Sequence, residues 1–547
     1  MPVPTETRPP RRGSVPVVVL AATLAFGALA GVWSVVAPLG EAPDEPAHLA
    51  LVLHLADGHP YPAYDGLENQ AAIIRLCRTY AAATRACPRD GEVVSPTSMR
   101  RHPREEAPDK SGRPAWNDEG GAAAIGQVNQ MPQHPPLYYQ AMASVLRVER
   151  ALLGGPSSTD RELALLRLVN AALIAPLPLL AWWAARRFRL SETAAVTASV
   201  AVFAVPMLTH IGSTLNNDNL LTLFGSIAIA LVAGVLRGDR SVRTAVLLGL
   251  VTGLAMLTKA FGIVLPPVIA LAYLLGALET AEGTRARRAL EAVKPLLVVG
   301  GLTLVLCGWW YVGVRARTGT FTPTVETSRL TEALQSPGFS PQVGTFLGEL
   351  SRNVDNRFWG SFGWYTIRFP SWLALMATGA TVAMVVWALV PRRDRSESTR
   401  LQRATFLVPL AALALLVAVR AWGLYALTSK FQFMQGRYLF AGIVGLVVVV
   451  AIGVERLAAR WSPLVVAAVA VVLQFEGLRR CLQGWWGGPG LGPRGQVRAL
   501  VAWSGWPGEL LGLLALVAVA AGAWFAVALV RFVLGAAEDR PVGSMPT

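Results

Sequence analysis

Charged residues are scarce in this chain of 547 residues: 15% are Asp, Glu, Lys or Arg, and 53% are hydrophobic. Soluble domains carry about a quarter of charged residues, so the composition excludes an ordinary soluble protein. Many apolar runs reach about 18 residues or more, which is enough to cross a bilayer as a helix. The chain is therefore predicted to be an all-α, polytopic membrane protein.

Cysteine is also scarce, with four residues in the chain. Cys77 and Cys87 fall in one predicted extracytoplasmic loop, where a disulfide bond is allowed, and the sequence leaves the bond and two free thiols both open. No cluster has the spacing of a metal site, so no metal ligand is assigned. The net charge of +15 fits arginine-rich cytoplasmic loops and does not point to nucleic acid as a partner.

Arginine clusters between the apolar runs set a topology, because loops rich in Lys and Arg stay in the cytoplasm. The clusters fall inside if residues 16–38 form an uncleaved first helix and both termini are cytoplasmic. The protein is expected in the cytoplasmic (inner) membrane of a bacterium. This count requires about twelve transmembrane helices. They are expected at residues 16–38, 163–185, 192–210, 219–236, 243–258, 261–277, 295–313, 371–391, 404–420, 438–455, 462–477 and 508–531.

Two long extracytoplasmic loops interrupt these helices. The first, residues 39–162, should contain two helices that lie in the membrane interface, at 46–56 and 135–153, with partly irregular chain between them. The expected division is a cytoplasmic tail (1–15), a first transmembrane module with that loop (16–313), the second loop (314–370), C-terminal transmembrane helices (371–534) and a cytoplasmic tail (535–547).

An acidic cluster, "EAPDEPAH", follows the first helix. Asp44 and His48 are one helical turn apart and share a helix face, and Glu45 lies beside them. A partly buried carboxylate at a helix end can act as a general base. One acidic residue would suffice to cap the next helix, so two acids and a histidine favour a functional role.

Two further polar clusters fall on the same predicted side. His134 directly precedes a tandem proline in "NQMPQHPPLYY", and Asp218 lies beside Asn217 in "STLNNDNLLTLF". A helix start explains the prolines, and helix capping explains Asp218, but neither requires the histidine. The side chains of His134 and Asp218 could face the same cavity as Asp44.

Cations and aromatic residues complete the set. Lys259 in "LTKAF" either snorkels or binds an anion. In "SKFQFMQGRYLF", Gln435, Arg437 and Tyr438 begin a helix on the outer side, where arginine is uncommon, which predicts a phosphate or a salt bridge to a loop acid. Trp364 in "FWGSFGW" belongs either to an interfacial aromatic belt or to a surface that stacks on sugar.

In these motifs the chain resembles the GT-C superfamily of integral-membrane glycosyltransferases. "PDEPAH" and "NNDNLLTLF" are similar to the two acidic motifs of that superfamily, and "HPPLYY" resembles a motif of protein O-mannosyltransferases and lipid A aminoarabinose transferases. "LTKAF" and "GRYLF" are similar to later segments of these proteins. Through "PDEPAH", "HPPLYY", "FWGSFGW" and "QGRYL", the chain most resembles the bacterial domain-of-unknown-function family 2142. The resemblance covers about residues 15–455.

The resemblance implies a GT-C-like bundle that transfers sugar from a polyprenyl-phosphate donor to an extracytoplasmic acceptor in the cell envelope, which could be a glycan, a lipid or a protein. Asp44 would be the general base and Glu45 its catalytic neighbour, with Glu45 and His48 positioning the base. His134, Asp218 and Lys259 would line the cavity, and Arg437 would bind the lipid phosphate. Direct displacement would invert the anomeric centre. Relatives differ in using a divalent cation, so a cation stays open.

Two other functions compete with this reading. A transporter or flippase of lipid-linked sugars would place binding groups near the middle of the membrane, often on broken helices, and the predicted spans hold few ionisable residues. A non-catalytic envelope-assembly protein is the third alternative, since a fold does not fix an activity.

Overall fold

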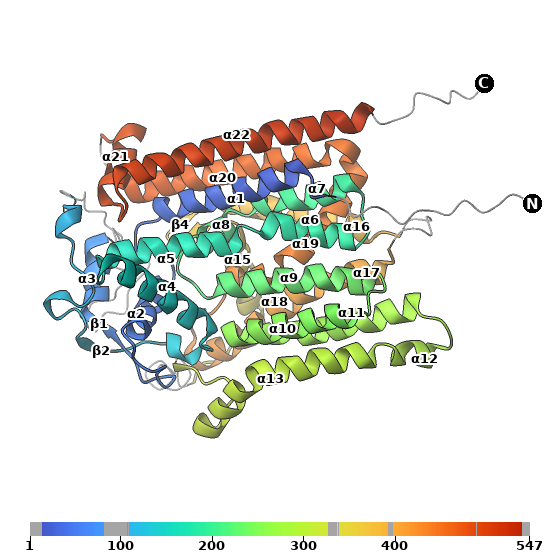
Figure 1. The fold of residues 1–547 in the computed structure, drawn as a ribbon, viewed down its shortest axis with the longest axis horizontal. Coiled ribbons are helices and arrows are strands. Elements are labelled where there is room, and N and C mark those ends of the chain that lie inside the picture. The colour runs from blue at the N-terminus through green and yellow to red at the C-terminus, as the bar shows by residue number, and fades with distance from the viewer. Residues whose placement is uncertain are drawn as a thin grey trace, which may run out of the picture.

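Long apolar helices lie side by side in this computed structural model and form one bundle (Figure 1). The structure describes residues 14–80, 107, 109–325, 336, 338–391, 398–487 and 490–538. Figure 1 shows the beginning of the first helix and the end of the last at the same end of the bundle, with short helices and strands gathered at the opposite end. The pairing left open for Cys77 and Cys87 falls outside the part of the chain described.

The elements in chain order are mostly helical. They are α1 (Val17–Val36), α2 (Glu45–Ala56), β1 (Glu68–Gln70), α3 (Ala71–Tyr80), η1 (Lys110–Gly112), η2 (Asp118–Gly120), β2 (Ala124–Val128), η3 (Met131–Gln133), α4 (Leu137–Leu153), α5 (Thr159–Ile174), α6 (Leu177–Arg187), α7 (Glu192–Ala201), η4 (Val202–Ala204), α8 (Pro206–Gly212), α9 (Asp218–Leu236), α10 (Val242–Thr258), η5 (Ala260–Val264), α11 (Leu265–Thr280), α12 (Arg285–Leu290), α13 (Val293–Thr318), α15 (Val343–Trp359), β3 (Ser361–Phe362), β4 (Ile367–Arg368), α16 (Ser371–Leu389), α17 (Arg400–Thr405), α18 (Val408–Thr428), η7 (Gly436–Gly442), α19 (Ile443–Ala458), η8 (Ala459–Trp461), α20 (Ser462–Trp486), α21 (Pro493–Trp503) and α22 (Gly508–Glu538).

The predicted all-α membrane fold is confirmed, but the count of twelve helices is not. Within the described residues, nine helical segments are long and apolar enough to cross a bilayer, or ten if α7 and α8, bent by 69° against each other, form one span. Two features account for the difference. α10 has only 17 residues, and Gly436–Trp486 counts as one segment although it contains both α19 and α20.

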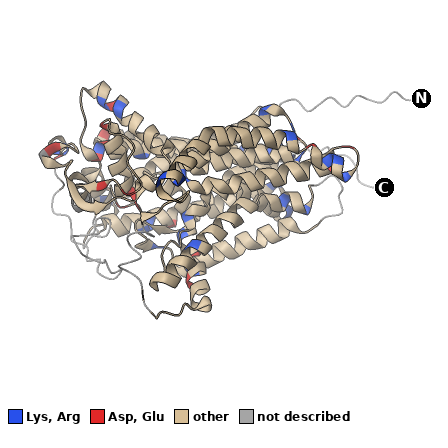
Figure 2. Ribbon diagram, turned by 90° about the horizontal axis from the view of Figure 1, so that it is seen from below, with Lys and Arg blue, Asp and Glu red and all other residues tan. Residues whose placement is uncertain are grey.

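Lys and Arg positions, blue in Figure 2, occur at the end of the bundle where α1 begins. There Arg187 donates to Asp239 at 2.7 Å and Arg237 donates to Gln402 at 3.4 Å, which joins the ends of α6, α9 and α17. These clusters thus lie together as expected, while the one at 392–395 lies outside the described residues. Which side of a membrane this end faces stays a prediction, as does the division of the chain into domains.

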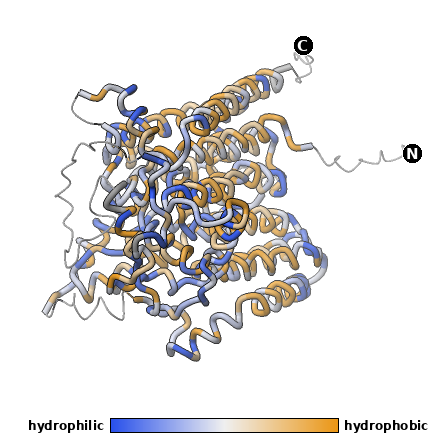
Figure 3. Tube along the Cα trace, turned by 60° about the vertical axis from the view of Figure 1, so that its left-hand side comes forward, coloured by the Kyte–Doolittle hydropathy of each residue, from blue (hydrophilic) through white to orange (hydrophobic). Residues whose placement is uncertain are grey.

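The described part of the first long loop forms a cap over the other end, where Figure 3 shows a largely hydrophilic chain against the hydrophobic helices. β1 and β2 pair antiparallel within the described part of this loop, and the partly irregular chain expected between the two helices stays a prediction. The expected helix at 135–153 is α4. α2 corresponds to the expected interfacial helix at 46–56, but it is buried along almost its whole length and packs against α4. A helix that is apolar all round is covered by protein, so its expected place in the membrane interface is corrected.

Close helix packing sets the position of η7, the segment that contains Arg437. Gly225 of α9 lies against the backbone of Ala441, and a Cβ atom there would be 2.4 Å from the Ala441 carbonyl oxygen. On the other side of η7, a Cβ at Gly442 would be 2.9 Å from the Leu410 backbone nitrogen in α18. Two glycines therefore let three helical segments meet where the site is built.

Gly225→Ala is expected to destabilise the protein, and Gly379→Ala is expected not to. The added methyl group at Gly225 meets the Ala441 carbonyl, whereas a Cβ at Gly379 in α16 meets open space. In a helix interior alanine is otherwise favoured over glycine by about 0.5–1 kcal/mol. The thermal unfolding midpoint in detergent measures both. A Gly225→Ala midpoint at or above that of the wild type would contradict the packing described.

Candidate active site

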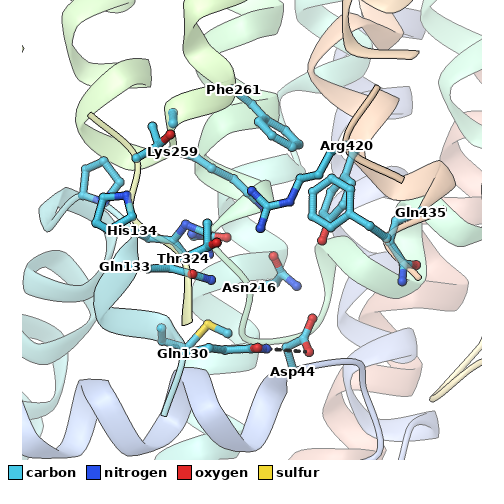
Figure 4. A pocket seen from close by; sticks show the side chains of 18 of the residues that line it. Asp44, Gln130, Gln133, His134, Asn216, Lys259, Phe261, Thr324, Arg420 and Gln435 are labelled. Carbon is cyan, nitrogen blue, oxygen red and sulfur yellow. Dashed lines mark hydrogen bonds between the residues drawn. The ribbon is translucent and has the colours of Figure 1, made fainter. Parts of the chain in front are cut away.

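A cavity of about 210 Å³ lies at the loop-rich end of the bundle (Figure 4). Its walls come from the start of α2, the approach to α4, the α8–α9 and α10–η5 connections, the end of α13, α18 and the segment before η7. Eight of the eleven predicted site residues line it. They are Asp44, His48, His134, Asn217, Lys259, Gln435, Arg437 and Tyr438.

Asp44 holds its carboxylate toward the cavity instead of capping α2. It occupies the N-cap position, but its side chain makes no capping hydrogen bond, and its backbone has a left-handed φ of 63°. Non-glycine residues take this conformation rarely, and such positions cluster at functional sites. The carboxylate pairs with Arg437 and accepts a 3.5 Å hydrogen bond from Gln130. The capping explanation for Asp44 is therefore wrong.

Four charges of alternating sign form a chain through the site. Arg437 pairs with Asp44 and lies 3.7 Å from Asp218 through its Nε, and Asp218 accepts a 2.5 Å hydrogen bond from Lys259 Nζ. Asp218, Lys259 and Arg437 are almost fully buried, whereas the Asp44 side chain is 23% exposed. Buried charges require such partners because desolvation is costly. Of the two acids in this row of charges, Asp44 thus has the greater access to the cavity.

The two predicted histidines supply neutral imidazoles. Burial, assisted by the positive charge of Lys259, holds the pKa of His48 well below its ordinary value of 6.5, and the same two causes lower the pKa of His134. His48 Nδ1 lies 3.0 Å from the hydroxyl of Tyr139, and the two rings stack. Both histidines can therefore exchange hydrogen bonds with a ligand at neutral pH without adding charge.

Glu45 is placed differently from the sequence prediction. Its carboxylate is fully buried, pairs with Arg167 of α5 at 2.5 Å, and accepts hydrogen bonds from the backbone nitrogens of Gly40 and Leu215. It is absent from the described lining of the cavity. Both oxygens are engaged in holding the α1–α2 turn against α5, so we replace the predicted catalytic role by a structural one.

Two more predicted residues lie just outside the main cavity. Asp218 sits behind Lys259 and does not line it, and Trp364 lines a neighbouring cavity that shares Asp44. Helix capping does not explain Asp218 either, because Asn217 holds the N-cap position of α9. Asp218 therefore contacts the lining of the main cavity through its ion pairs with Lys259 and Arg437.

Sequence reasoning missed Arg420 and Gln130. Arg420 projects into the cavity from α18, as Figure 4 shows, with its guanidinium 4.4 Å from the centre of the Phe433 ring. The sequence did carry a signal for Arg420, because an arginine near the end of an otherwise apolar segment is a candidate functional residue. Gln130 stands four residues before His134 in the motif "NQMPQHPPLYY", but an uncharged side chain there carried no such signal.

The charged side chains that line the site are mostly cationic, unlike the ligands of a metal centre. No group of three or more His, Cys, Asp and Glu side chains among the described residues could hold a metal ion. Asp44 and Asp218 point their oxygens at Arg437 and Lys259. The divalent cation that the resemblance left open stays a prediction.

The fold and site define a membrane protein with a cavity at one end of its helices that is lined by lysine, arginine and aspartate side chains. A family model described as "Predicted membrane protein (DUF2142)" matches residues 26–473, and the chain belongs to this family. A comparison with curated proteins finds no match.

Solved structures similar to the chain include ArnT from Cupriavidus metallidurans bound to undecaprenyl phosphate, with 18% identity over 74% of this chain and 68% of that one and a TM-score of 0.37. The Archaeoglobus fulgidus oligosaccharyltransferase in complex with Zn and sulfate is 12% identical over 64% of this chain and 44% of that one, with a TM-score of 0.34. Similarity at this level does not bear on activity.

Glu45→Gln is expected to lower the free energy of unfolding by about 3–5 kcal/mol, because it leaves the buried Arg167 guanidinium without its anion. Glu349→Gln is the control: its partner Arg352 is 65% exposed, and exposed pairs contribute less than about 1 kcal/mol. Unfolding followed by the thermal midpoint compares the two variants. Equal midpoints would contradict the structural role given to Glu45.

Proposed function

We propose that this protein is a membrane glycosyltransferase that moves a sugar from a polyprenyl-phosphate carrier to an acceptor hydroxyl. The observation that carries the proposal is the meeting of one carboxylate with three cations in a single cavity. Among the described residues lining it, Lys259, Arg420 and Arg437 are basic and Asp44 is acidic. This arrangement offers a proton acceptor beside a binding site for an anion.

The three cations suit a phosphate group. Lysine is a compact charge with three donors, and the arginine guanidinium matches phosphate with parallel hydrogen bonds. Lys259 and Arg437 are already paired with Asp218 and Asp44, so a phosphate would join these pairs as a further acceptor for their remaining N–H groups. Water has little access to Lys259 and Arg437, and charge-assisted hydrogen bonds are stronger in such surroundings. Leaving-group charge would be stabilised there as it develops.

A neighbouring groove suits the lipid chain of such a donor. It has a volume of about 930 Å³, an almost wholly apolar lining, and walls from α15, α16, α18 and the start of α19. Val417 in this groove is one helical turn from Arg420, and Leu439 is two residues from Arg437. A polyprenyl chain in the groove would therefore place its phosphate at the cationic cavity.

In the proposed reaction, Asp44 takes the proton of the acceptor hydroxyl. The hydroxyl oxygen forms a bond with the anomeric carbon, the bond from that carbon to the phosphate oxygen breaks, and its electron pair leaves with the lipid phosphate. Arg437 contacts Asp44 and faces the phosphate site, so one side chain orients the base and balances the leaving group. A single displacement inverts the anomeric centre. The acceptor would belong to the envelope outside the cytoplasmic membrane.

A transporter of lipid-linked sugars is the second candidate, because α7 and α8 form a bent pair of the kind that transporters use. The four charges, however, stand at helix ends and not at helix middles: Asp44 holds the N-cap position of α2, Asp218 begins α9 and Lys259 follows the end of α10. Transport and transfer differ in their dependence on Asp44, since moving a substrate across the membrane consumes no proton acceptor.

Asp44→Asn is expected to lower sugar transfer at least about 100-fold, because general base catalysis contributes that much or more. Its affinity for undecaprenyl phosphate should stay within a few-fold, since the cations remain. Transfer is measured as recovery of envelope glycan in a deletion strain that expresses the variant, and binding with purified protein in nanodiscs.

Asp57→Asn, at the other end of α2, is the matched control and should transfer at the wild-type level. Normal envelope glycan in the Asp44→Asn strain would refute the enzymatic role and favour transport.

Arg420→Gln and Lys259→Gln should each weaken undecaprenyl phosphate binding about tenfold or more, because a hydrogen bond to a charged group contributes about 1.5–3 kcal/mol and 1.4 kcal/mol is tenfold in affinity. Arg352→Gln removes a charge from an exposed site and should leave the affinity unchanged. The dissociation constant in nanodiscs measures all three. Unchanged affinity in both cavity variants would place the phosphate elsewhere.

A further inference from the structure

A second, smaller cavity adjoins the first at Asp44. It has a volume of about 200 Å³ and shares two lining residues, Asp44 and Gln130, with the cationic cavity. Among the described residues, its lining contains no Lys, Arg or His, and Asp44 is its one charged group. Asp44 thus borders both a cationic cavity and a neutral one.

The cap over the end of the bundle builds this second cavity. Asn69 of β1, Gln127 of β2, Ile73 of α3 and Ala47 of α2 line it, and Trp364 enters from the β3–β4 connection. Asn69 Nδ2 donates to Gln127 Oε1 at 3.3 Å, so the paired strands hold two amide side chains together. The first long loop therefore has a defined part in the site.

Some polar groups of this lining make fewer hydrogen bonds than they could. Asn69 Oδ1 and Trp364 Nε1 have no hydrogen-bond partner among the described residues, although both atoms are buried. Buried polar atoms without partners are costly, and a ligand with donors and acceptors would satisfy them. Amide side chains beside an indole suit a ligand that has hydroxyl groups around an apolar ring face, which is the chemistry of a neutral sugar.

We propose that the second cavity is the acceptor site and that the acceptor is a carbohydrate. This inference rests on the proposed function. The amide groups of Asn69, Gln127 and Gln130 bind sugar hydroxyls, and Trp364 contacts the ring. One hydroxyl reaches Asp44 from this side and gives up its proton, while the donor phosphate lies on the other side against Arg437. The donor and acceptor thus enter through different cavities and meet at the carboxylate.

Trp364→Ala and Asn69→Ala test the acceptor site in the deletion strain used above. Each variant should lower recovery of envelope glycan about tenfold or more, while purified protein binds undecaprenyl phosphate within twofold of the wild type. Trp364→Phe keeps an aromatic ring and should fall between wild type and Trp364→Ala. Trp372→Ala, at a side chain 61% exposed on α16, should behave as wild type. Thermal unfolding midpoints identify any variant that is simply unfolded.

Normal glycan recovery in Trp364→Ala and Asn69→Ala would overturn the proposal, and so would a tenfold loss of undecaprenyl phosphate binding, because the cavity would then belong to the donor. The acceptor class is read from the product: transferred sugar should remain with polysaccharide after proteinase digestion, and its recovery on peptides would reject a carbohydrate acceptor. If wild-type protein itself leaves the envelope glycan of the deletion strain unchanged, the proposed function fails instead.

Discussion

The pairing of Asp44 with Arg437 is the contact on which the whole site depends. It joins residues separated by 393 positions, at the start of α2 and in η7. Arg437 also lies near Asp218, which in turn binds Lys259. If this chain of charges were broken, buried groups on three elements would lose their partners. The chain therefore fixes both the shape of the cavity and the direction in which the carboxylate points.

The rest of the fold makes room for these charges and keeps them apart from lipid. Gly225 and Gly442 allow η7 to approach α9 and α18, and the Glu45–Arg167 pair anchors the turn that holds Asp44. The cap formed by β1, β2, α3 and α4 closes the same end of the bundle. Asp44 borders both a cationic cavity and a neutral one. In the proposed function this carboxylate is the base, the cationic cavity takes the anion and the neutral cavity takes the acceptor hydroxyl.

Hydropathy and arginine positions predict most of the helices, because apolar length and charge are properties of short stretches of chain. The same local signals predicted that Asp44, Lys259 and Arg437 lie at one end of the bundle. Glu45 was misassigned because its partner Arg167 is 122 residues away, and no spacing rule connects them. Trp364 was predicted to belong to an aromatic belt or to a sugar-stacking surface, and the fold places it in a cavity beside the one lined by Lys259 and Arg437. Tertiary contacts of this kind cannot be deduced from the pattern of a single sequence.

The most direct measurement is an electron cryo-microscopy structure of the full-length protein in nanodiscs with undecaprenyl phosphate. The account predicts that the phosphate lies within hydrogen-bond distance of Lys259, Arg420 and Arg437, on the opposite side of the Asp44 carboxylate from Trp364. A phosphate bound at the other end of the bundle, or in the cavity lined by Trp364, would contradict it.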